Sequence, residues 1–205
     1  SKANVYSSSL RISEHELNTY MEGICHAFYS YAEAKQIKLD YKSNFEYQNV
    51  WFDKEKMDSI TKNLISNAIK YTPAHGEVHI IICHDKDNWS LEITDTGIGI
   101  PAKEQKKLFK LHFRGSNAIN AKITGSGIGL MLVWKLVRIH KGKISIESVE
   151  NKGTRVKVIF PQKQFRNQQV PTETVQQENV APVSPSAVSP HTYKDLYRQH
   201  VQNTQ

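Results

Sequence analysis

Apolar and polar residues alternate in two pairs of short segments, and this alternation is the period of a β-strand. In the first pair, segments 78–83 and 89–95 flank a polar turn. In the second pair, segments 143–148 and 154–160 flank another polar cluster, and Pro161 follows. Each pair therefore predicts a β-hairpin.

Three longer segments place apolar residues at every third or fourth position, which is the period of an α-helix. They cover residues 17–34, 53–71 and 128–140, and the last precedes Gly142, a residue that commonly follows helices. A further strand is expected at residues 37–41. Helices combined with antiparallel hairpins predict an α+β fold, a two-layer sandwich with a mixed, mostly antiparallel sheet and three main helices on one face.

The middle helix carries two stripes of different character. An apolar stripe faces the predicted core, and a polar stripe lies beside it at three- and four-residue steps. The polar stripe consists of Asn63, Asn67 and Lys70. A row of amides and one amine thus borders a buried face.

Length and composition predict one globular domain followed by a tail. The chain has 205 residues, of which 39% are hydrophobic and 23% are charged. After Pro161 it becomes rich in Gln, Val, Pro, Ser and Thr, with little to bury. Residues 162–205 are therefore expected to be a low-complexity linker or tail, with a short amphipathic helix at 193–201.

The charge and the cysteines exclude several other classes of protein. The net charge is +7, but the basic residues are spread along the chain, which argues against a nucleic-acid partner. No apolar run of membrane-spanning length occurs. Direct membrane contact by this fragment is therefore not expected, and a cytoplasmic location is expected. The pairs Cys25-His26 and Cys83-His84 suggest zinc, but neighbours on a strand point to opposite faces, so buried core cysteines are predicted instead.

Two glycine-rich segments have the composition of ligand-binding loops. In segment 95–101, Asp95 ends a predicted strand and two glycines follow, although a simple Asx-capped turn would have the same pattern. Segment 125–130 begins the third predicted helix with three glycines, and free backbone amides at a helix N-terminus can bind phosphate. Leu130 stands where the Rossmann fingerprint needs its third glycine, and the chain contains no P-loop.

The order of these motifs resembles the ATP-binding catalytic domain of sensor histidine kinases. Residues 63–73 resemble the N box, 95–101 the first glycine box, 108–115 the F box and 125–130 the second glycine box. The resemblance covers roughly residues 8 to 161. It implies the Bergerat sandwich with a flexible ATP lid. It also implies a catalytic domain at 10–161, with residues 1–9 as the end of a linker from an absent phosphoacceptor domain.

The resemblance also implies roles for individual residues. Asn67 would coordinate the Mg²⁺ that bridges the triphosphate of ATP, with Asn63 assisting in catalysis. Lys70 and Arg114 would neutralise charge on the phosphates, and Asp95 would accept a hydrogen bond from the adenine amino group. Further ATP contacts are implied for Tyr71, Gly97, Gly99, Ile100, Gly125, Gly127, Gly129, Leu130 and Thr154. Taken singly, each polar residue could equally be a surface amide, a solvated charge or an ion-pair partner.

His15 resembles the phosphoacceptor histidine of this family, because Glu16 and Leu17 follow it. However, Asn18 and Tyr20 replace the basic residue and the proline of that motif. Only 48 residues separate His15 from Asn63, and a two-helix phosphoacceptor domain before the first strand and helix would need roughly twice that number. The phosphoacceptor histidine is therefore expected on a separate domain.

The activity that the resemblance implies is that of a protein-histidine kinase. The domain would transfer the ATP γ-phosphoryl group to a histidine on its dimerisation and phosphoacceptor domain, for relay to the receiver domain of a response regulator. The fragment would belong to the cytoplasmic side of a membrane-anchored bacterial receptor. Two alternatives remain: a nucleotide-binding pseudokinase, and a related Bergerat-fold ATPase, which would need a Glu where Asn63 stands.

Overall fold

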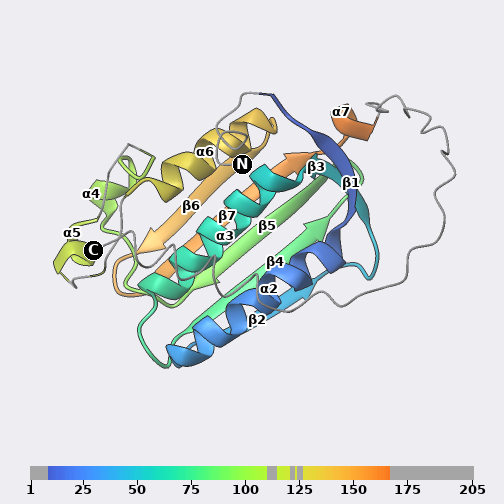
Figure 1. Cartoon of the computed structure of the whole chain (residues 1–205). Coiled ribbons are helices and arrows are strands. Elements are labelled where there is room, and N and C mark those ends of the chain that lie inside the picture. Colours follow the sequence, from blue (N-terminus) through green and yellow to red (C-terminus); the bar gives the residue numbers. More distant parts are fainter. Residues whose placement is uncertain (1–8, 110–114, 121–122, 124–126, 167–205) are drawn as a thin grey trace, which may run out of the picture. The chain divides into compact units, whose positions relative to one another are not determined.

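The computed structural model describes residues 9–109, 115–120, 123 and 127–166. Arg114, Gly125 and the expected tail helix at 193–201 lie outside these ranges. The described chain folds as a sheet covered by helices on one face (Figure 1).

Within the described ranges, five strands form the main sheet, in the order β2–β4–β5–β7–β6 (Figure 1). Strand β2 pairs with β4 in parallel, and the other neighbours pair in antiparallel fashion. The strands are β2 (Lys38–Ser43), β4 (Glu77–His84), β5 (Asn88–Asp95), β6 (Lys143–Val149) and β7 (Gly153–Pro161). Both predicted hairpins and the mixed, mostly antiparallel sheet are confirmed.

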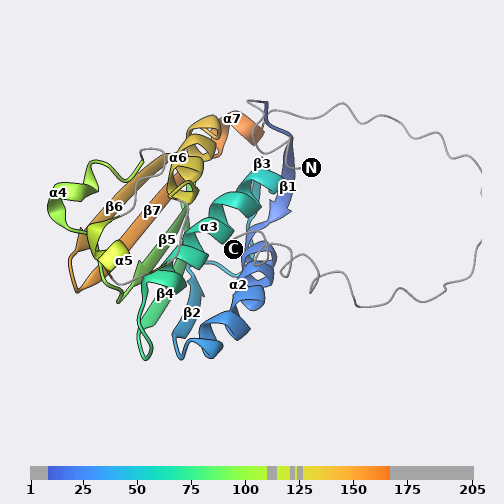
Figure 2. The same ribbon diagram turned by 60° about the vertical axis from the view of Figure 1, so that its left-hand side comes forward.

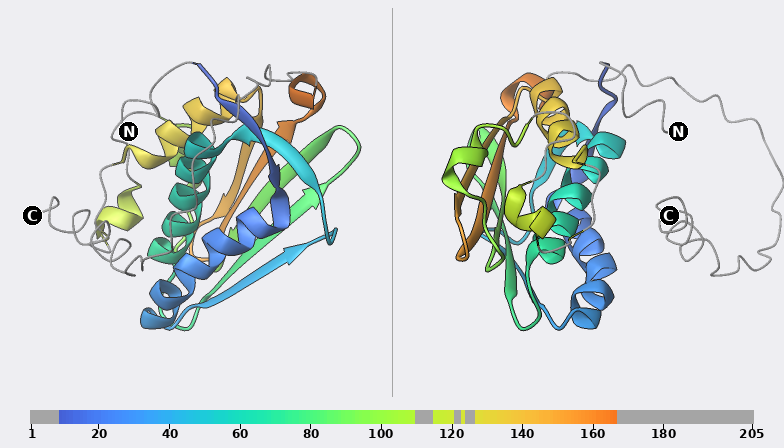
Figure 3. Two further views of the ribbon diagram at one scale, coloured as in Figure 1. Left: turned by 45° about the vertical axis from the view of Figure 1, so that its right-hand side comes forward. Right: turned by 90° about the vertical axis from the view of Figure 1, so that its left-hand side faces the viewer.

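The three long helices cover one face of this sheet, as Figures 2 and 3 show from the side. They are α2 (Leu17–Ala34), α3 (Lys54–Tyr71) and α6 (Gly129–Ile139). Their apolar stripes pack on alternate residues of the central strands, among them the fully buried Ile60 of α3 and Leu91 of β5. The opposite face of the sheet carries ion pairs such as Arg155–Glu92 at 2.9 Å, which explains why the helices cover one face.

A second, two-stranded sheet was not predicted. Strand β1 (Ile12–Glu16) pairs antiparallel with β3 (Asn49–Asp53), and His15 lies opposite Val50. The His15 ring stacks on Phe52 at 4.4 Å between ring centroids. His15 is therefore part of a strand of this domain and does not lie on a phosphoacceptor helix.

Helix α3 begins one residue later than predicted because Asp53 is its N-cap. Asp53 Oδ1 accepts a hydrogen bond from the Lys56 amide at 3.1 Å, and Oδ2 lies 3.0 Å from the Lys56 ammonium. Both side chains are buried, so each charge depends on the other for compensation. The Arg11 amide also donates to Asp53 Oδ2, at 2.9 Å, which ties the start of β1 to the start of α3.

The folded domain continues past the predicted end at Pro161. Helix α7 (Lys163–Arg166) follows β7, with Gln162 and Phe165 buried against the domain. The core assignment of Cys25 is confirmed, because this residue is 1% exposed, and burial raises the pKa of its thiol to about 12. Cys83 is only partly buried, which differs from the prediction of a core cysteine. Among the described helices, none combines the length and the apolar character needed to cross a bilayer.

Candidate functional site

Asp95 ends strand β5 at the point where the chain enters the first glycine box. Its side chain is 8% exposed. Oδ1 accepts hydrogen bonds from the amides of Gly97 at 2.8 Å and Thr154 at 3.2 Å. The carboxylate is thus fixed between two strands and the loop that follows.

Among the described residues, none donates a hydrogen bond to the second oxygen of this carboxylate. Within the described part of the chain, both hydrogen bonds to Asp95 end on Oδ1. Burial raises the pKa of Asp95 to about 6, and the amides of Gly97 and Thr154 oppose this rise. A buried carboxylate with one unsatisfied oxygen is suited to accept a hydrogen bond from an amino group.

The two glycines of this box are required by the backbone. A Cβ on Gly97 would lie 2.5 Å from the carbonyl oxygen of Tyr71, so no side chain fits there. Gly99 has φ of +63°, and a Cβ there would overlap the Val149 carbonyl. The loop therefore passes close to the end of α3 and to the end of β6.

The two amides of the predicted polar stripe, Asn63 and Asn67 of α3, face the start of α6. A Cβ on Gly129 would lie 2.6 Å from Asn63 Oδ1 and 4.0 Å from Asn67 Nδ2. The amide of Asn63 donates to the Ser59 carbonyl at 2.7 Å, so its oxygen is the atom directed at α6. Glycine at 129 leaves space between the two amides and the N-terminus of α6. Gly127, with φ of +70°, supplies the turn before that helix.

The C-terminal end of α3 connects the two halves of the site. The Lys70 ammonium lies 5.0 Å from the centroid of the Tyr71 ring. The Tyr71 carbonyl accepts a hydrogen bond from the Ile98 amide at 3.0 Å, which joins α3 to the first glycine box. Asn63, Asn67 and Lys70 thus lie on α3, whose C-terminal end is bonded to the loop that follows Asp95.

The remaining predicted site residues that the structure describes make contacts within the protein itself. Leu130 packs against the main core. Thr154 places its hydroxyl 2.9 Å from the Ser148 hydroxyl, next to Asp95. The Ile100 carbonyl accepts a hydrogen bond from the Gln105 side chain at 3.1 Å. Arg114 and Gly125 lie outside the described residues, so their roles stay predictions.

Three polar residues near the site were not predicted from the sequence. Lys35 donates to carbonyls at the end of α3, and Gln105 and Asn117 donate to carbonyls of the first glycine box. None of the three belongs to a recognised box, and Lys35 and Asn117 act across 34 and 18 positions of sequence. No periodicity or spacing in the sequence marks them.

The residues present fit a magnesium ion carried by a nucleotide. Among the described residues, no group of three or more His, Cys, Asp or Glu side chains is placed to hold a metal ion. The candidate ligand is instead the half-buried amide of Asn67. Mg²⁺ prefers oxygen ligands and usually takes few from protein beside those from water and phosphate. One amide beside a glycine-lined helix start matches that preference.

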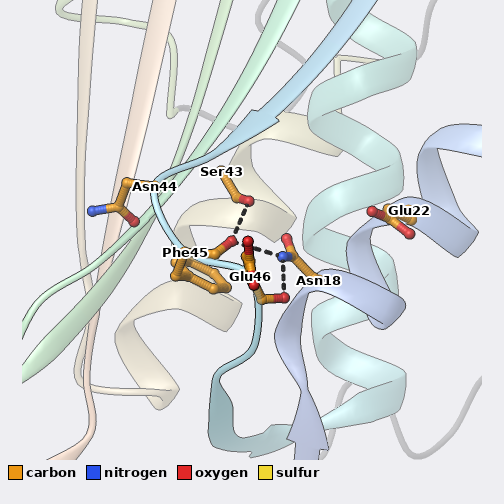
Figure 4. Close-up of a pocket in the computed structure, with 6 residues that line it drawn as sticks. All are labelled: Asn18, Glu22, Ser43, Asn44, Phe45 and Glu46. Carbon is orange, nitrogen blue, oxygen red and sulfur yellow. Dashed lines mark hydrogen bonds between the residues drawn. The ribbon is translucent and has the colours of Figure 1, made fainter.

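A separate hollow lies at the start of α2 and is not part of this site (Figure 4). Its volume is about 630 Å³, and it lies between α2 and the loop after β2. The Asn18 amide there donates to the carbonyls of Phe45 and Glu46 at 2.9 and 2.8 Å, so this amide is already satisfied. The C-terminal end of α2, at Lys35, is the end that contacts α3 near Lys70.

Comparisons with known proteins agree with this geometry. The family model described as "Histidine kinase-, DNA gyrase B-, and HSP90-like ATPase" matches residues 52–164. The circadian input-output histidine kinase CikA of Synechocystis sp. is 31% identical over 160 residues, which cover 77% of this chain and 21% of that protein. The chain therefore spans about a fifth of the length of this curated relative.

Solved structures share the fold. The catalytic domain of histidine kinase ThkA superposes with a TM-score of 0.65 at 24% identity, covering 74% of this chain and 98% of that one. Full-length ShkA in complex with AMPPNP superposes with a TM-score of 0.66 at 18% identity, covering 75% of this chain and 32% of that one. The family match, the order of the four boxes and the placement of Asp95 and Asn67 lead to one assignment: this chain belongs to the family of histidine kinase-, DNA gyrase B- and HSP90-like ATPases.

Proposed function

We propose that this domain binds ATP with Mg²⁺ and transfers the γ-phosphoryl group to a histidine on a separate dimerisation and phosphoacceptor domain. The observation that carries the proposal is the buried Asp95 carboxylate, whose Oδ2 accepts no hydrogen bond from the described residues and whose loop is bonded to the C-terminal end of α3. The AMPPNP complex of ShkA, which shares this fold, supports an adenine nucleotide as the ligand.

Asp95 supplies the base selectivity in this proposal. An ionised carboxylate accepts hydrogen bonds and donates none, so Oδ2 can pair with the 6-amino group of adenine. Guanine presents a carbonyl oxygen at that position, which the carboxylate would repel. The domain is therefore expected to prefer ATP to GTP.

The polar stripe of α3 would position the triphosphate. The Asn67 amide would hold the Mg²⁺, which supplies neutralisation of phosphate charge when it is bound. Lys70 would place a cation on the phosphates, where a flexible ammonium acts as a point charge. The glycine-lined start of α6 would offer backbone amides to phosphate oxygens.

Asn63 favours phosphoryl transfer over hydrolysis. Its amide nitrogen donates to the Ser59 carbonyl at 2.7 Å, which directs the oxygen towards α6. An amide cannot accept a proton from water, so Asn63 cannot serve as the general base of an ATPase. In the proposed reaction it orients the reacting groups instead.

The partners follow from the activity. The phosphoacceptor and dimerisation domain would be the substrate, and the receiver domain of a response regulator would take the phosphoryl group from its histidine. A membrane-anchored receptor, with this domain on the cytoplasmic side, is the arrangement that the family resemblance supports. The histidine kinase relative from Synechocystis sp. supports the two-component assignment.

The activity is tested by mixing the domain with its phosphoacceptor domain and γ-labelled ATP. We expect label on the acceptor histidine, and we expect no label when that histidine of the phosphoacceptor domain is replaced. Binding of ATP without any transfer would instead identify a pseudokinase, and release of free phosphate without the acceptor would identify an ATPase.

The metal role of Asn67 is tested by calorimetry on Asn67→Ala with ATP and Mg²⁺. We expect at least about a tenfold loss of affinity, equal to roughly 1.4 kcal/mol. Lys62→Ala is the control, because Lys62 lies on the same helix but is exposed and pairs with Asp58 at 3.4 Å. Unchanged affinity in Asn67→Ala would remove Asn67 from the metal site.

A further inference from the structure

The first glycine box is held by side-chain amides from the two short helices that follow it. Asn117 Nδ2, on α5 (Ser116–Asn120), donates to the carbonyls of Gly99 at 2.8 Å and Ile98 at 3.3 Å. Gln105 Nε2, at the end of α4 (Ala102–Gln105), donates to the Ile100 carbonyl at 3.1 Å. Three consecutive carbonyls of the loop are therefore bonded to the segment between the two glycine boxes.

Helix α5 is itself fastened next to this loop. Glu104 Oε2 accepts a hydrogen bond from the Ser116 amide at 2.9 Å. Asn117 Oδ1 accepts one from the Ala118 amide at 3.0 Å, and Ala118 is 5% exposed. The Asn117 side chain is thus oriented by a hydrogen bond within its own helix, and its amino group donates hydrogen bonds to the loop.

The Gly99 carbonyl depends on Asn117 more than the Ile98 carbonyl does. Ile98 is also fixed through the Tyr71 carbonyl and the Asn151 amide, at 3.0 and 2.8 Å. Among the hydrogen bonds that join described residues, the Gly99 carbonyl accepts one, from Asn117. Gly99 adopts φ of +63°, a conformation that a flexible glycine does not keep without such constraints.

We propose that Asn117 is a positioning residue of the nucleotide site, which fixes the Gly99 peptide and couples occupation of the site to the placement of α5. The inference rests on the proposed function for the identity of the ligand. A nucleotide that binds beside Asp95 and Gly97 stabilises the loop conformation to which Asn117 is bonded. Coupling between two sites is reciprocal, so if the placement of α5 strengthens nucleotide binding, bound nucleotide stabilises α5 in that placement by the same free energy.

The test compares Asn117→Asp with the wild type. The substitution keeps the size of the side chain but removes its donor and faces carboxylate oxygens towards two carbonyls. Without nucleotide, we expect amide exchange at residues 98–100 and 115–120 to accelerate by about tenfold or more. With Mg²⁺ and ATP, we expect the affinity to fall by about 5- to 50-fold and the slowing of exchange at 115–120 by nucleotide to be lost.

Two further variants separate this role from a general loss of structure. Asn117→Ala removes the donor without adding charge and should show the same changes. Asn44→Asp is the matched control, because Asn44 also donates to a backbone carbonyl, that of His84 at 3.3 Å, and lies at the hollow away from the site. The control should keep both the exchange rates and the ATP affinity of the wild type.

Wild-type exchange rates in both Asn117 variants, or faster exchange with unchanged ATP affinity, would overturn the proposal. So would faster exchange across the whole domain, since that would show unfolding instead of a local role. If the wild-type domain binds no ATP, the proposed function fails. The exchange comparison without nucleotide would still show whether Asn117 fixes the loop, and unchanged rates there would reject it independently.

Discussion

At the scale of single residues, the proposed adenine contact of Asp95 comes with a cost in stability. Burial raises the pKa of its carboxyl to about 6, against the opposing effect of the Gly97 and Thr154 amides. In this pH region the folded domain holds a proton that the unfolded chain has released. Stability therefore falls as the pH rises from about 4 to about 6, and the full cost of burying the charge is present above that range.

We expect Asp95→Asn to stabilise the nucleotide-free domain near neutral pH, because the amide has no charge to bury. A gain on the order of 1–3 kcal/mol is expected, since one pKa unit corresponds to about 1.4 kcal/mol. Urea unfolding at about pH 7.5 and about pH 4.5 measures it, and the gain should shrink at the lower pH. A gain of equal size at both pH values would show that the charge of Asp95 is not its cause.

The same substitution is expected to weaken ATP binding by roughly 1–3 kcal/mol, the scale of a lost charge-assisted hydrogen bond in a closed pocket. Binding of GTP should begin weak and change little. Calorimetry with both nucleotides decides the point, and equal losses for both would mean that Asp95 does not read the base.

Residues inside recognisable motifs could be predicted from the sequence, and residues outside them could not. Asn67 and Asp95 could be proposed as site residues because each belongs to a box with a fixed order along the chain. Asn117 donates to Gly99, 18 positions earlier, and Lys35 donates to Ile69, 34 positions later. Their roles arise from tertiary placement alone, and neither spacing nor composition signals it.

At the scale of elements, the C-terminal end of α3 is held by a cation from α2. The Lys35 ammonium donates to the carbonyls of Ile69 at 2.7 Å, Lys70 at 3.1 Å and Thr72 at 3.3 Å. A helix leaves its last carbonyls without intrahelical partners, and a cation there also complements the helix dipole. Because Lys70 and Tyr71 belong to this turn, Lys35 supports both the fold and the site.

We expect Lys35→Met to destabilise the domain by about 1–3 kcal/mol, because half-buried carbonyls lose a charged donor. Methionine keeps the length and apolar stem of the side chain, so lost packing contributes little. Chemical unfolding measures the change. Lys38→Met is the control, since Lys38 is exposed and pairs with Asp40 at 3.1 Å on the surface. Equal stability of the two variants would contradict the capping role.

Elements with strong periodicity were predicted, whereas those that depend on a distant partner were missed. Helix α3 and hairpin β4–β5 each bury one regular face, so their sequences show it. Strand β1 has the sequence Ile-Ser-Glu-His-Glu, with one aliphatic residue, and is a strand because it pairs with β3. Helices α4 and α5 have four and five residues, which are too few to show a helical period.

At the scale of the whole molecule, the sandwich was predictable but its C-terminal limit was not. The change to a polar composition after Pro161 suggested an end there. The structure instead uses Gln162 to bond the second sheet, since its Oε1 accepts from the Trp51 amide at 2.7 Å. The backbone amide of Gln162 donates to the Asp87 carbonyl at 2.8 Å, and Phe165 is 5% exposed. Two residues in a polar segment thus join β3 to the main sheet.

We therefore expect a chain that ends at Pro161 to be less stable than one that ends at Arg166, by about 2–4 kcal/mol. Burial of a phenylalanine side chain contributes roughly 1.5–3 kcal/mol, and the Trp51 amide would lose its partner. Phe165→Ala and Gln162→Ala in the longer chain should each reproduce part of the loss, with urea unfolding as the measurement. Lys163→Ala, on an exposed position of α7, should leave stability unchanged. Equal stability of the two truncated chains would return the domain boundary to Pro161 and show that α7 adds nothing to the sandwich.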